Sequence, residues 1–317
     1  MNYRFHRPCT QWSRAVALLA ALAATTLATK YADDFEELGT SARAIGIGGA
    51  VVAAADDPSA IYYNPSLTSG LARTSVLFLH SEDFSGLVNH NYLGVSFHSP
   101  LQSIGLAVLQ NGIPGIKLTA LHDTTQPVGP NNRPYDSAEV SANQVVGYVN
   151  YARTLSPYAS VGGNVKLIYE DLGVGSAFGM GLDVGATLTP MPDLNVGLRI
   201  RNASTSPLYW DTGTQELVMP RGALGLAKTF RFSRDCLTLA FEADANLEGL
   251  DFTPNYGLEY GFRNVLFGRL GVYQGNFTFG VGLRIKRFRV DYGYAAGVAP
   301  DARDLGSPQQ ISGGFEF

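Results

Sequence analysis

The chain has 317 residues, of which 16% are charged, 11% are aromatic and 36 are glycine, and its formal net charge is −4. Low charge, much glycine and many tyrosines suit a membrane β-barrel and, less well, a soluble β-sandwich. No basic run indicates contact with nucleic acid, and no apolar run of helix-spanning length lies beyond the N-terminus.

Residues 1–28 have the pattern of a secretory signal peptide. Arg4, Arg7 and Arg14 form a basic region around the start of the apolar segment 15–24, which is too short to span a bilayer. Small residues before position 29 place the cleavage site after Ala28. A buried N-terminal helix is the alternative. We therefore expect a mature chain that leaves the cytoplasm and, after cleavage, holds one cysteine and no internal disulfide.

Residues 29–72 do not alternate and are predicted to form a separate N-terminal segment. Residues 41–56 are rich in alanine, glycine and valine and predict a short helix with a small-residue face. Asp57 as N-cap and Pro58 at the first helical position predict a second helix. That helix should end at Asn64-Pro65, because the residue before a proline avoids the α region.

From residue 73 to the C-terminus the pattern is one of β-strands. Many of these strands have about ten residues, which is the length a tilted strand needs to cross the hydrocarbon layer. Their number is even, as single-chain bacterial barrels require. The predicted strands are 73–81, 87–98, 102–112, 140–154, 158–171, 175–190, 193–202, 218–230, 235–246, 253–262, 264–274, 276–287, 287–298 and 307–317. We therefore predict an all-β fold, a closed antiparallel transmembrane barrel of about fourteen strands.

The alternation of side chains is clearest between residues 276 and 286. Phe277, Val281 and Ile285 fall on one face, and Thr278 and Arg284 fall on the other. A period of two indicates a strand with one apolar and one polar face. A soluble barrel would turn the apolar face inward, whereas a membrane barrel turns it towards lipid and lines its lumen with the charged residues.

The predicted connections are uneven in length. Residues 112–139, 203–217 and 298–307 are expected to be long loops, whereas Arg263-Asn264 and Gln274-Gly275 are short turns. Short turns on one side and long loops on the other are the layout of outer-membrane barrels. A loop as long as 112–139 would be unusual in a compact soluble domain.

The last strand ends on an aromatic residue, as bacterial outer-membrane barrels usually do. Phe315 and Phe317 form an alternating aromatic pair at the C-terminus, which we predict to be the signal read by the outer-membrane assembly machinery. Ser312 stands where such signals usually have glycine.

A motif between Gly39 and Leu71 resembles the start of the PorV/PorQ family, part of the larger group of FadL-type outer-membrane barrels. The chain departs from the family pattern at Ser66, where alanine is usual. The residues that carry the resemblance are Gly39, Ala42, Arg43, Gly48, Gly49, Ala50, Asp56, Asp57, Pro58, Ser59, Ala60, Tyr62, Tyr63, Asn64 and Pro65.

This resemblance implies a fourteen-stranded barrel whose N-terminal segment sits in the lumen as a plug. Gly48 and Gly49 would let the plug approach the wall closely. Arg43, Asp56 and Asp57 would need partners among the lumen charges, because unpaired buried charges are costly. The alternative is that these are ordinary exposed residues. Even in a plug, the motif residues, Pro58, Asn64 and Pro65 included, are expected to be structural.

The resemblance also implies a function at the bacterial outer membrane. PorV-type proteins act in type IX secretion, where they receive exported proteins, and FadL-type proteins pass hydrophobic molecules. We therefore expect a role in protein secretion or translocation, with FadL-like passage of hydrophobic small molecules or a purely structural barrel as alternatives. The expected partners are outer-membrane lipid, the assembly machinery, and secreted cargo proteins or a hydrophobic ligand.

Of the functions considered, an enzymatic one has the least support from the sequence. The histidines after the cleavage site are His80, His90, His98 and His122, and none of them stands in a recognisable nucleophile motif. No cysteine cluster or histidine pair has the spacing of metal ligands. We therefore predict a non-enzymatic protein with no metal and no cofactor.

Overall fold

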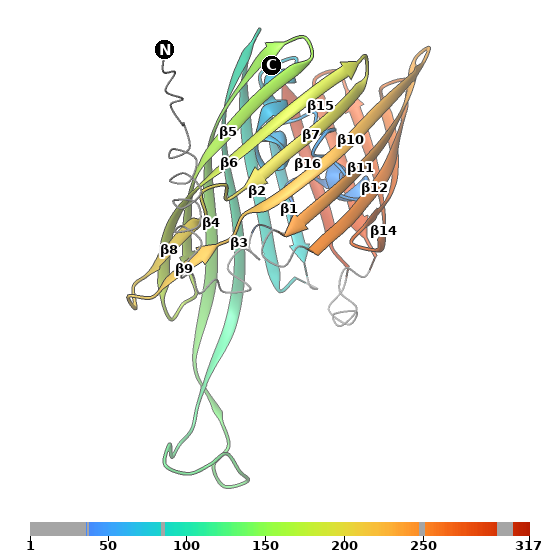
Figure 1. The fold of residues 1–317 in the computed structure, drawn as a ribbon. Coiled ribbons are helices and arrows are strands. Elements are labelled where there is room, and N and C mark those ends of the chain that lie inside the picture. Colours follow the sequence, from blue (N-terminus) through green and yellow to red (C-terminus); the bar gives the residue numbers. More distant parts are fainter. Residues whose placement is uncertain (1–35, 37, 84–85, 247–250, 297–306) are drawn as a thin grey trace, which may run out of the picture.

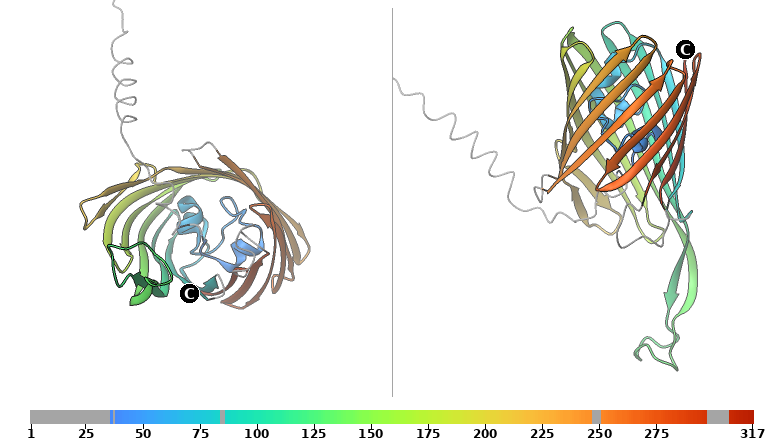
Figure 2. Two further views of the ribbon diagram at one scale, coloured as in Figure 1. Left: turned by 90° about the horizontal axis from the view of Figure 1, so that it is seen from below. Right: turned by 90° about the vertical axis from the view of Figure 1, so that its right-hand side faces the viewer.

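The computed structural model describes residues 36, 38–83, 86–246, 251–296 and 307–317, so the predicted signal peptide at 1–28 and nearly all of the loop predicted at 298–307 lie outside the described residues. Fourteen strands form one closed antiparallel barrel, as predicted (Figures 1 and 2). The first and last strands, β1 and β16, pair directly, and the ladder runs from Ser75 opposite Glu316 to Ser81 opposite Gln310. The barrel strands are β1 (Ser75–Asp83), β2 (Val88–Ser99), β3 (Gln102–Ala120), β4 (Tyr135–Ser156), β5 (Ala159–Asp171), β6 (Ser176–Met191), β7 (Leu194–Arg201), β10 (Arg221–Phe232), β11 (Asp235–Asn246), β12 (Asp251–Phe262), β13 (Leu266–Tyr273), β14 (Asn276–Ile285), β15 (Phe288–Ala295) and β16 (Gln309–Glu316).

The two faces of the wall differ in polarity. On β14, Phe277 is 78% exposed and Val281 is 54% exposed on the outside, whereas Thr278 is buried on the inside. A closed barrel with an apolar outer surface and a polar interior is typical of barrels that are surrounded by lipid. The expectation that the apolar face points outward is therefore confirmed. None of the helices in the described part of the chain is long and apolar enough to cross a membrane.

The connections at the two ends of the barrel differ, as expected. Two or three residues join β2 to β3, β4 to β5, β6 to β7, β10 to β11, β12 to β13 and β14 to β15 at one end, termed the turn end here. The connections at the other end, termed the loop end, include the long segments between β3 and β4 and between β7 and β10. In outer-membrane barrels the longer loops face the outside of the cell.

Much of the loop predicted at 112–139 is strand. β3 continues to Ala120 and β4 begins at Tyr135, so the two form a hairpin that extends well beyond the rest of the barrel (Figure 1). Pro114, which lies within the predicted loop, falls in an irregularity of the ladder between Ile113 and Ile116. A bulge is one of the few places where a sheet tolerates proline.

The loop predicted at 203–217 also contains strands. β8 (Ser206–Trp210) and β9 (Gln215–Val218) form a hairpin that pairs with β6 only. The pairing of β7 with β10 therefore stops where Arg201 faces Arg221. The chain leaves β7 through Asn202, whose φ is +52°, a conformation that asparagine adopts more readily than most residues.

The segment before β1 lies inside the barrel, as the end-on view shows (Figure 2). It contains α2 (Ala42–Gly46), α3 (Ala60–Tyr63) and the 3₁₀-helix η2 (Pro65–Gly70). We term Glu36 together with residues 38–71 the plug. Alanine and isoleucine side chains of the plug, such as Ala44, Ile47 and Ile61, form one buried cluster with inward apolar side chains of the wall.

The helices of the plug are shorter than predicted. Instead of spanning 41–56, the first ends at Gly46, and Gly48 and Gly49 follow with φ of +72° and +73°. Positive φ stops an α-helix, and glycine adopts it at the lowest cost. The second helix begins at Ala60, not near Asp57. It ends before Asn64, as predicted, and Pro65 then starts η2.

Candidate functional site: the plugged lumen

Charged side chains tie the plug to the wall at several heights. Arg43 on α2 donates from Nε and Nη2 to the two carboxylate oxygens of Glu259 on β12, both at 2.9 Å. The Nη1 of Arg43 donates to the carbonyl oxygen of Ala54 at 2.7 Å, which also fixes the fold of the plug itself. Arg269 on β13 reaches the same Glu259 at 2.5 Å. One buried carboxylate is therefore shared by a plug arginine and a wall arginine.

Asp56 holds the plug nearer the turn end. Its carboxylate lies 2.7 Å from Arg289 on β15, 3.4 Å from Arg284 on β14 and 3.5 Å from Arg43. Asp57 lies beside it and accepts hydrogen bonds from the backbone N–H and the hydroxyl of Ser59, at 2.9 and 2.5 Å. Asp57 thus caps the turn before α3, and Asp56 binds the wall.

Glu36 anchors the opposite end of the plug. Its carboxylate accepts from Lys166 on β5 at 2.7 and 2.8 Å and from the hydroxyl of Tyr148 on β4 at 2.5 Å. Burial raises the pKa of the Glu36 carboxyl, but Lys166 and Arg201 outweigh burial and hold that pKa below its ordinary value. The backbone carbonyl of Glu36 accepts from the hydroxyl of Tyr62. Glu36 is therefore an ionised anchor near the loop end.

A second wall carboxylate binds the plug backbone. Glu242 on β11 accepts from the backbone N–H groups of Val51 and Val52, both at 2.8 Å. Within the plug, Asn64 donates to the carbonyl oxygen of Val52 at 2.7 Å and accepts from the hydroxyl of Ser66 at 2.7 Å. These contacts satisfy backbone groups of the plug that no sheet could pair.

Glycines in the wall give the plug room. A side chain at Gly271 on β13 would meet the backbone of Ile47 and Gly48, and one at Gly257 on β12 would meet the backbone of Ile47. Further wall glycines face the plug in the same way: Gly162 on β5, Gly185 on β6, Gly197 on β7, Gly225 on β10 and Gly293 on β15. The plug backbone therefore rests directly on the wall, in a track of lumen glycines.

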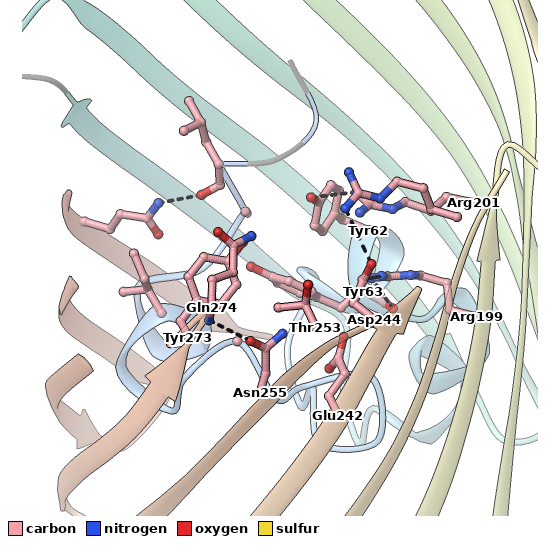
Figure 3. A pocket seen from close by; sticks show the side chains of 16 residues that line it. Tyr62, Tyr63, Arg199, Arg201, Glu242, Asp244, Thr253, Asn255, Tyr273 and Gln274 are labelled. Carbon is pink, nitrogen blue, oxygen red and sulfur yellow. Dashed lines mark hydrogen bonds and ion pairs between the residues drawn. The ribbon is translucent and has the colours of Figure 1, made fainter. Parts of the chain in front are cut away.

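A cavity of about 70 Å³ lies on the loop-end side of the plug (Figure 3). Tyr62 and Tyr63 of α3 and Tyr273 of β13 form part of its wall. The charged residues that line it are Arg199 and Arg201 of β7, Arg221 of β10, and Glu242 and Asp244 of β11. Arg199 lies 2.8 Å from Asp244 and donates to the carbonyl oxygen of Tyr63 at 3.2 Å. We term this space the outer cavity.

A larger cavity of about 610 Å³ lies on the turn-end side. Plug residues such as Ala54 and Leu67 form its floor, and wall residues such as Thr189, Asn195 and Thr238 line its sides. We term it the inner cavity. The plug therefore lies between a small space at the loop end and a wider one at the turn end, and charged side chains line both.

The structure places the predicted motif residues in different roles. Arg43, Asp56, Asp57 and Asn64 bind the wall or cap turns within the plug, as described above. Gly48 lies against the backbone of Tyr256 and Val272, and Gly49 lies against the ring of Tyr273. Pro58 offers its carbonyl oxygen to the hydroxyl of Tyr92, at 2.8 Å. The C-terminal rings of Phe315 and Phe317 contact each other with centroids 4.9 Å apart.

The four histidines do not gather at one place. His90 is buried and holds the carbonyl oxygen of Gly39 at 2.5 Å, so it contacts the plug. His80 pairs with Asn91, and His122 stacks on Tyr135 in the projecting hairpin, with ring centroids 4.4 Å apart. In the described part of the chain, no group of three or more histidine, cysteine, aspartate or glutamate residues could hold a metal ion.

Sequence reasoning missed the outer cavity and the glycine track. The charged residues of the strands, among them Arg199, Arg201, Glu242 and Asp244, were expected to line the lumen and to pair with opposite charges on neighbouring strands, but nothing in their spacing joined them to Tyr62. The sequence did offer one signal for the glycine track, because Gly185 and Gly197 lie on the polar face of their strands. A glycine on a face that should carry polar side chains indicates a close neighbour.

No protein-family model matches the sequence, and no curated protein matches it. Among solved structures, the Pseudomonas putida toluene transporter TodX is similar at 13% identity, over 87% of this chain and 96% of that chain, with a TM-score of 0.58. A Pseudomonas aeruginosa FadL homologue is similar at 12% identity, over 88% and 98%, with a TM-score of 0.52. The CymD monoaromatic hydrocarbon channel is similar at 11% identity, over 88% and 98%, with a TM-score of 0.52. At such identities the similarity concerns the fold, and this chain has the fold of the FadL-type barrels.

Proposed function

We propose that this chain is a bacterial outer-membrane barrel that passes small solutes from the loop end to the turn end when its plug shifts. The observation that carries the proposal is that an outer and an inner cavity lie in the lumen and that plug residues line both of them. The barrels with the same fold include a toluene transporter and a monoaromatic hydrocarbon channel, which supports passage as the kind of function.

The lining of the outer cavity favours polar solutes over purely hydrophobic ones. Three arginines and two carboxylates line it beside three tyrosines. An apolar molecule would leave these charges without water or a partner, which is costly in a confined space. We therefore propose a cargo with polar groups, in contrast to the hydrophobic cargo expected from the FadL-type resemblance.

A disulfide that locks the plug tests the proposal. The hydroxyls of Ser66 in η2 and Thr187 in β6 lie 2.7 Å apart, so Ser66→Cys with Thr187→Cys is expected to bring two thiols into contact. Cys236 is first changed to serine to remove the competing thiol. In vesicles, solute flux through the oxidised protein should fall and should recover on reduction. Equal flux in both states would overturn passage by plug movement.

A role in protein secretion is the second candidate, and one observation favours it. The hairpin of β3 and β4 extends beyond the barrel at the loop end and is held by Lys117 and Asp136 at 2.8 Å (Figure 1). A projecting hairpin offers exported proteins a surface that a plugged lumen does not. With the motif at Gly39–Leu71, this supports a PorV-like role in type IX secretion.

Shortening the hairpin separates the two candidates. Residues 114–140 are replaced by a short turn, and both solute flux and the secretion of proteins with type IX signals are measured. A secretion role predicts lost secretion with unchanged flux and unchanged heat-modifiable gel mobility. Normal secretion by the shortened protein rejects that role and leaves passage untouched.

The membrane partners are proposed from the surface and the C-terminus. The apolar outer face fits outer-membrane lipid, and the terminal pair Phe315 and Phe317 fits recognition by the assembly machinery. Deletion of Phe317 should lower the amount of folded barrel in the outer membrane, whereas refolding of the purified variant into detergent should be unchanged. Normal membrane levels of the deletion variant would contradict the assembly role.

A further inference from the structure

Among the residues that the structure describes, several buried polar atoms without hydrogen-bond partners belong to side chains that line the outer cavity. They are Nε of Arg199, Nε of Arg201, Oδ1 of Asp244 and Oε1 of Gln310. All four residues line the cavity, and the side chains of Arg199 and Arg201 come from the same strand and face (Figure 3). Buried polar groups are normally paired, so a cluster of unpaired ones around one space points to a ligand.

The charges of this cluster favour an anion. Arg201 faces Arg221 across the β7–β10 ladder, and like charges in that position repel. Asp244 is shared between Arg199 at 2.8 Å and Arg221 at 3.6 Å. Arg201, which is 6% exposed, lies near the carboxylate of Glu36, but its hydrogen bonds go to neutral oxygens, namely the hydroxyl of Tyr62 at 2.7 Å and the backbone carbonyl of Glu36 at 3.3 Å. Nε of Arg199 and Nε of Arg201, which make no hydrogen bond within the described residues, are therefore placed to donate to a carboxylate.

The unpaired acceptors add a second requirement. Oε1 of Gln310 needs a donor, which a carboxylate alone does not supply, and Oδ1 of Asp244 lies 3.6 Å from Nη2 of Arg221, which is longer than a hydrogen bond. The cavity of about 70 Å³ admits only a small molecule. The ring of Tyr62 lies under the guanidinium of Arg201, 4.8 Å from its carbon, and keeps that planar group oriented for a planar carboxylate.

We propose that the outer cavity binds a small organic carboxylate that also carries a hydroxyl or ammonium group. Arg201 and Arg199 hold the carboxylate; the single O–H of a hydroxyl group donates to Asp244 or to Gln310, and an ammonium group has donors for both. The inference names the substrate class of the proposed passage function, and it rests on that function for the route by which the ligand arrives. Binding itself is measured without flux.

Glycolate and acetate are the probes for the first experiment. Their binding to the folded full chain in detergent is measured by saturation-transfer NMR and calorimetry. Glycolate should bind more tightly than acetate, and ethylene glycol should not bind. No glycolate binding would overturn the inference, whereas flux of neutral solutes in vesicles would still uphold passage. If glycolate binds but no solute crosses the vesicle membrane, the proposed passage function is rejected and the proposed binding site is supported.

Variants of Arg201 connect the binding to the site. Arg201→Gln should weaken glycolate binding by about tenfold or more, because it removes charge-assisted hydrogen bonds to the ligand. Arg201→Lys should restore part of the affinity, which a general loss of folding would not allow. Arg234→Gln, an exposed arginine in a turn at the far end, is the matched control and should bind as the wild type does. Equal binding by Arg201→Gln and the wild type would overturn the assignment.

Acidic side chains of the chain itself are an alternative partner for the arginines of the outer cavity, and the test must distinguish them from an external ligand. Asp33, Asp34 and Glu37 flank Glu36 in the sequence. Glycolate binding is therefore compared between the wild type and a variant in which these three are changed to Asn, Asn and Gln. Binding by both proteins supports a ligand site. Binding by the variant alone would mean that the arginines serve the chain's own carboxylates, and it would overturn the proposal.

Discussion

Arg43 of the plug and Glu259 of β12 face each other as a fork, with two parallel hydrogen bonds of 2.9 Å. Both side chains are almost fully buried, at 6% and 7% exposure. Such bidentate pairs fix orientation as well as distance. The pair therefore sets where α2 sits against the wall, and the plug cannot move without separating it.

Removal of one partner of this pair should loosen the plug. Arg43→Met leaves Glu259 buried without the plug's charge, and breaking a buried pair typically costs about 3–5 kcal/mol. Hydrogen exchange measured by mass spectrometry should show faster exchange in plug peptides. The double variant Arg43→Met with Glu259→Met removes both charges, and Arg269 keeps its ion pair with Asp291 at 2.8 Å, so this variant should exchange more slowly than Arg43→Met. Equally fast exchange in the single and double variants would contradict an ion-pair anchor.

A side chain in the glycine track should displace the plug. Gly271→Val on β13 would push against the backbone of Ile47 and Gly48, and overpacking of this kind costs about 1–3 kcal/mol. Gly268 on the same strand points outward, with nothing within 4 Å of an added side-chain carbon, so Gly268→Val is the matched control. Planar-bilayer conductance should rise for Gly271→Val only. A silent Gly271→Val, or an equal rise in both, would show that the track does not seat the plug.

The wall of the barrel was predictable because its signal is local. In β14 the period of two alone separates Phe277 and Val281 from Thr278, and the structure keeps that division. The β3–β4 hairpin was mistaken for a loop because proline and glycine normally punctuate strands. Pro114 and Gly115 lie in a bulge, where the strand tolerates both. Whether a bulge forms depends on the partner strand as well as on the segment itself.

The interior of the barrel was only partly predictable. That Arg43 needs a lumen partner follows from the cost of burying a charge, but the identity of Glu259 does not, since 216 positions separate the two. The outer cavity depends on β7, β10 and β11 meeting α3 at one height. The position along the barrel axis at which these strands meet α3 depends on strand register and on the fold of the plug. Neither can be predicted from the spacing of Arg199 and Arg201.

Acid should release the loop end of the plug. Lys166 and Arg201 hold the pKa of Glu36 below its ordinary value of 4.5, so its stabilisation is complete above that pH. The stabilisation is lost as the pH falls below 4.5 and through the lowered pKa of the folded protein. Bilayer conductance should therefore rise on acidification below 4.5. Glu36→Gln should already conduct at neutral pH and should lack this part of the rise; a rise of the same size in Glu36→Gln would assign it to other groups.

Charge on the outer face of β14 should destabilise the barrel according to depth. Val281 lies in the middle of the strand and Ile285 at its turn end, and their exposed fractions are nearly equal, 54% and 53%. Val281→Arg would place a guanidinium near the bilayer midplane, which costs about 2–4 kcal/mol, whereas Ile285→Arg near the interface should cost about 0–1 kcal/mol. Urea unfolding in lipid vesicles measures both free energies. Since the two sites share a strand, a face and an exposure, only membrane depth distinguishes them. Equal free energies for the two variants would therefore mean that this face does not meet a hydrocarbon layer.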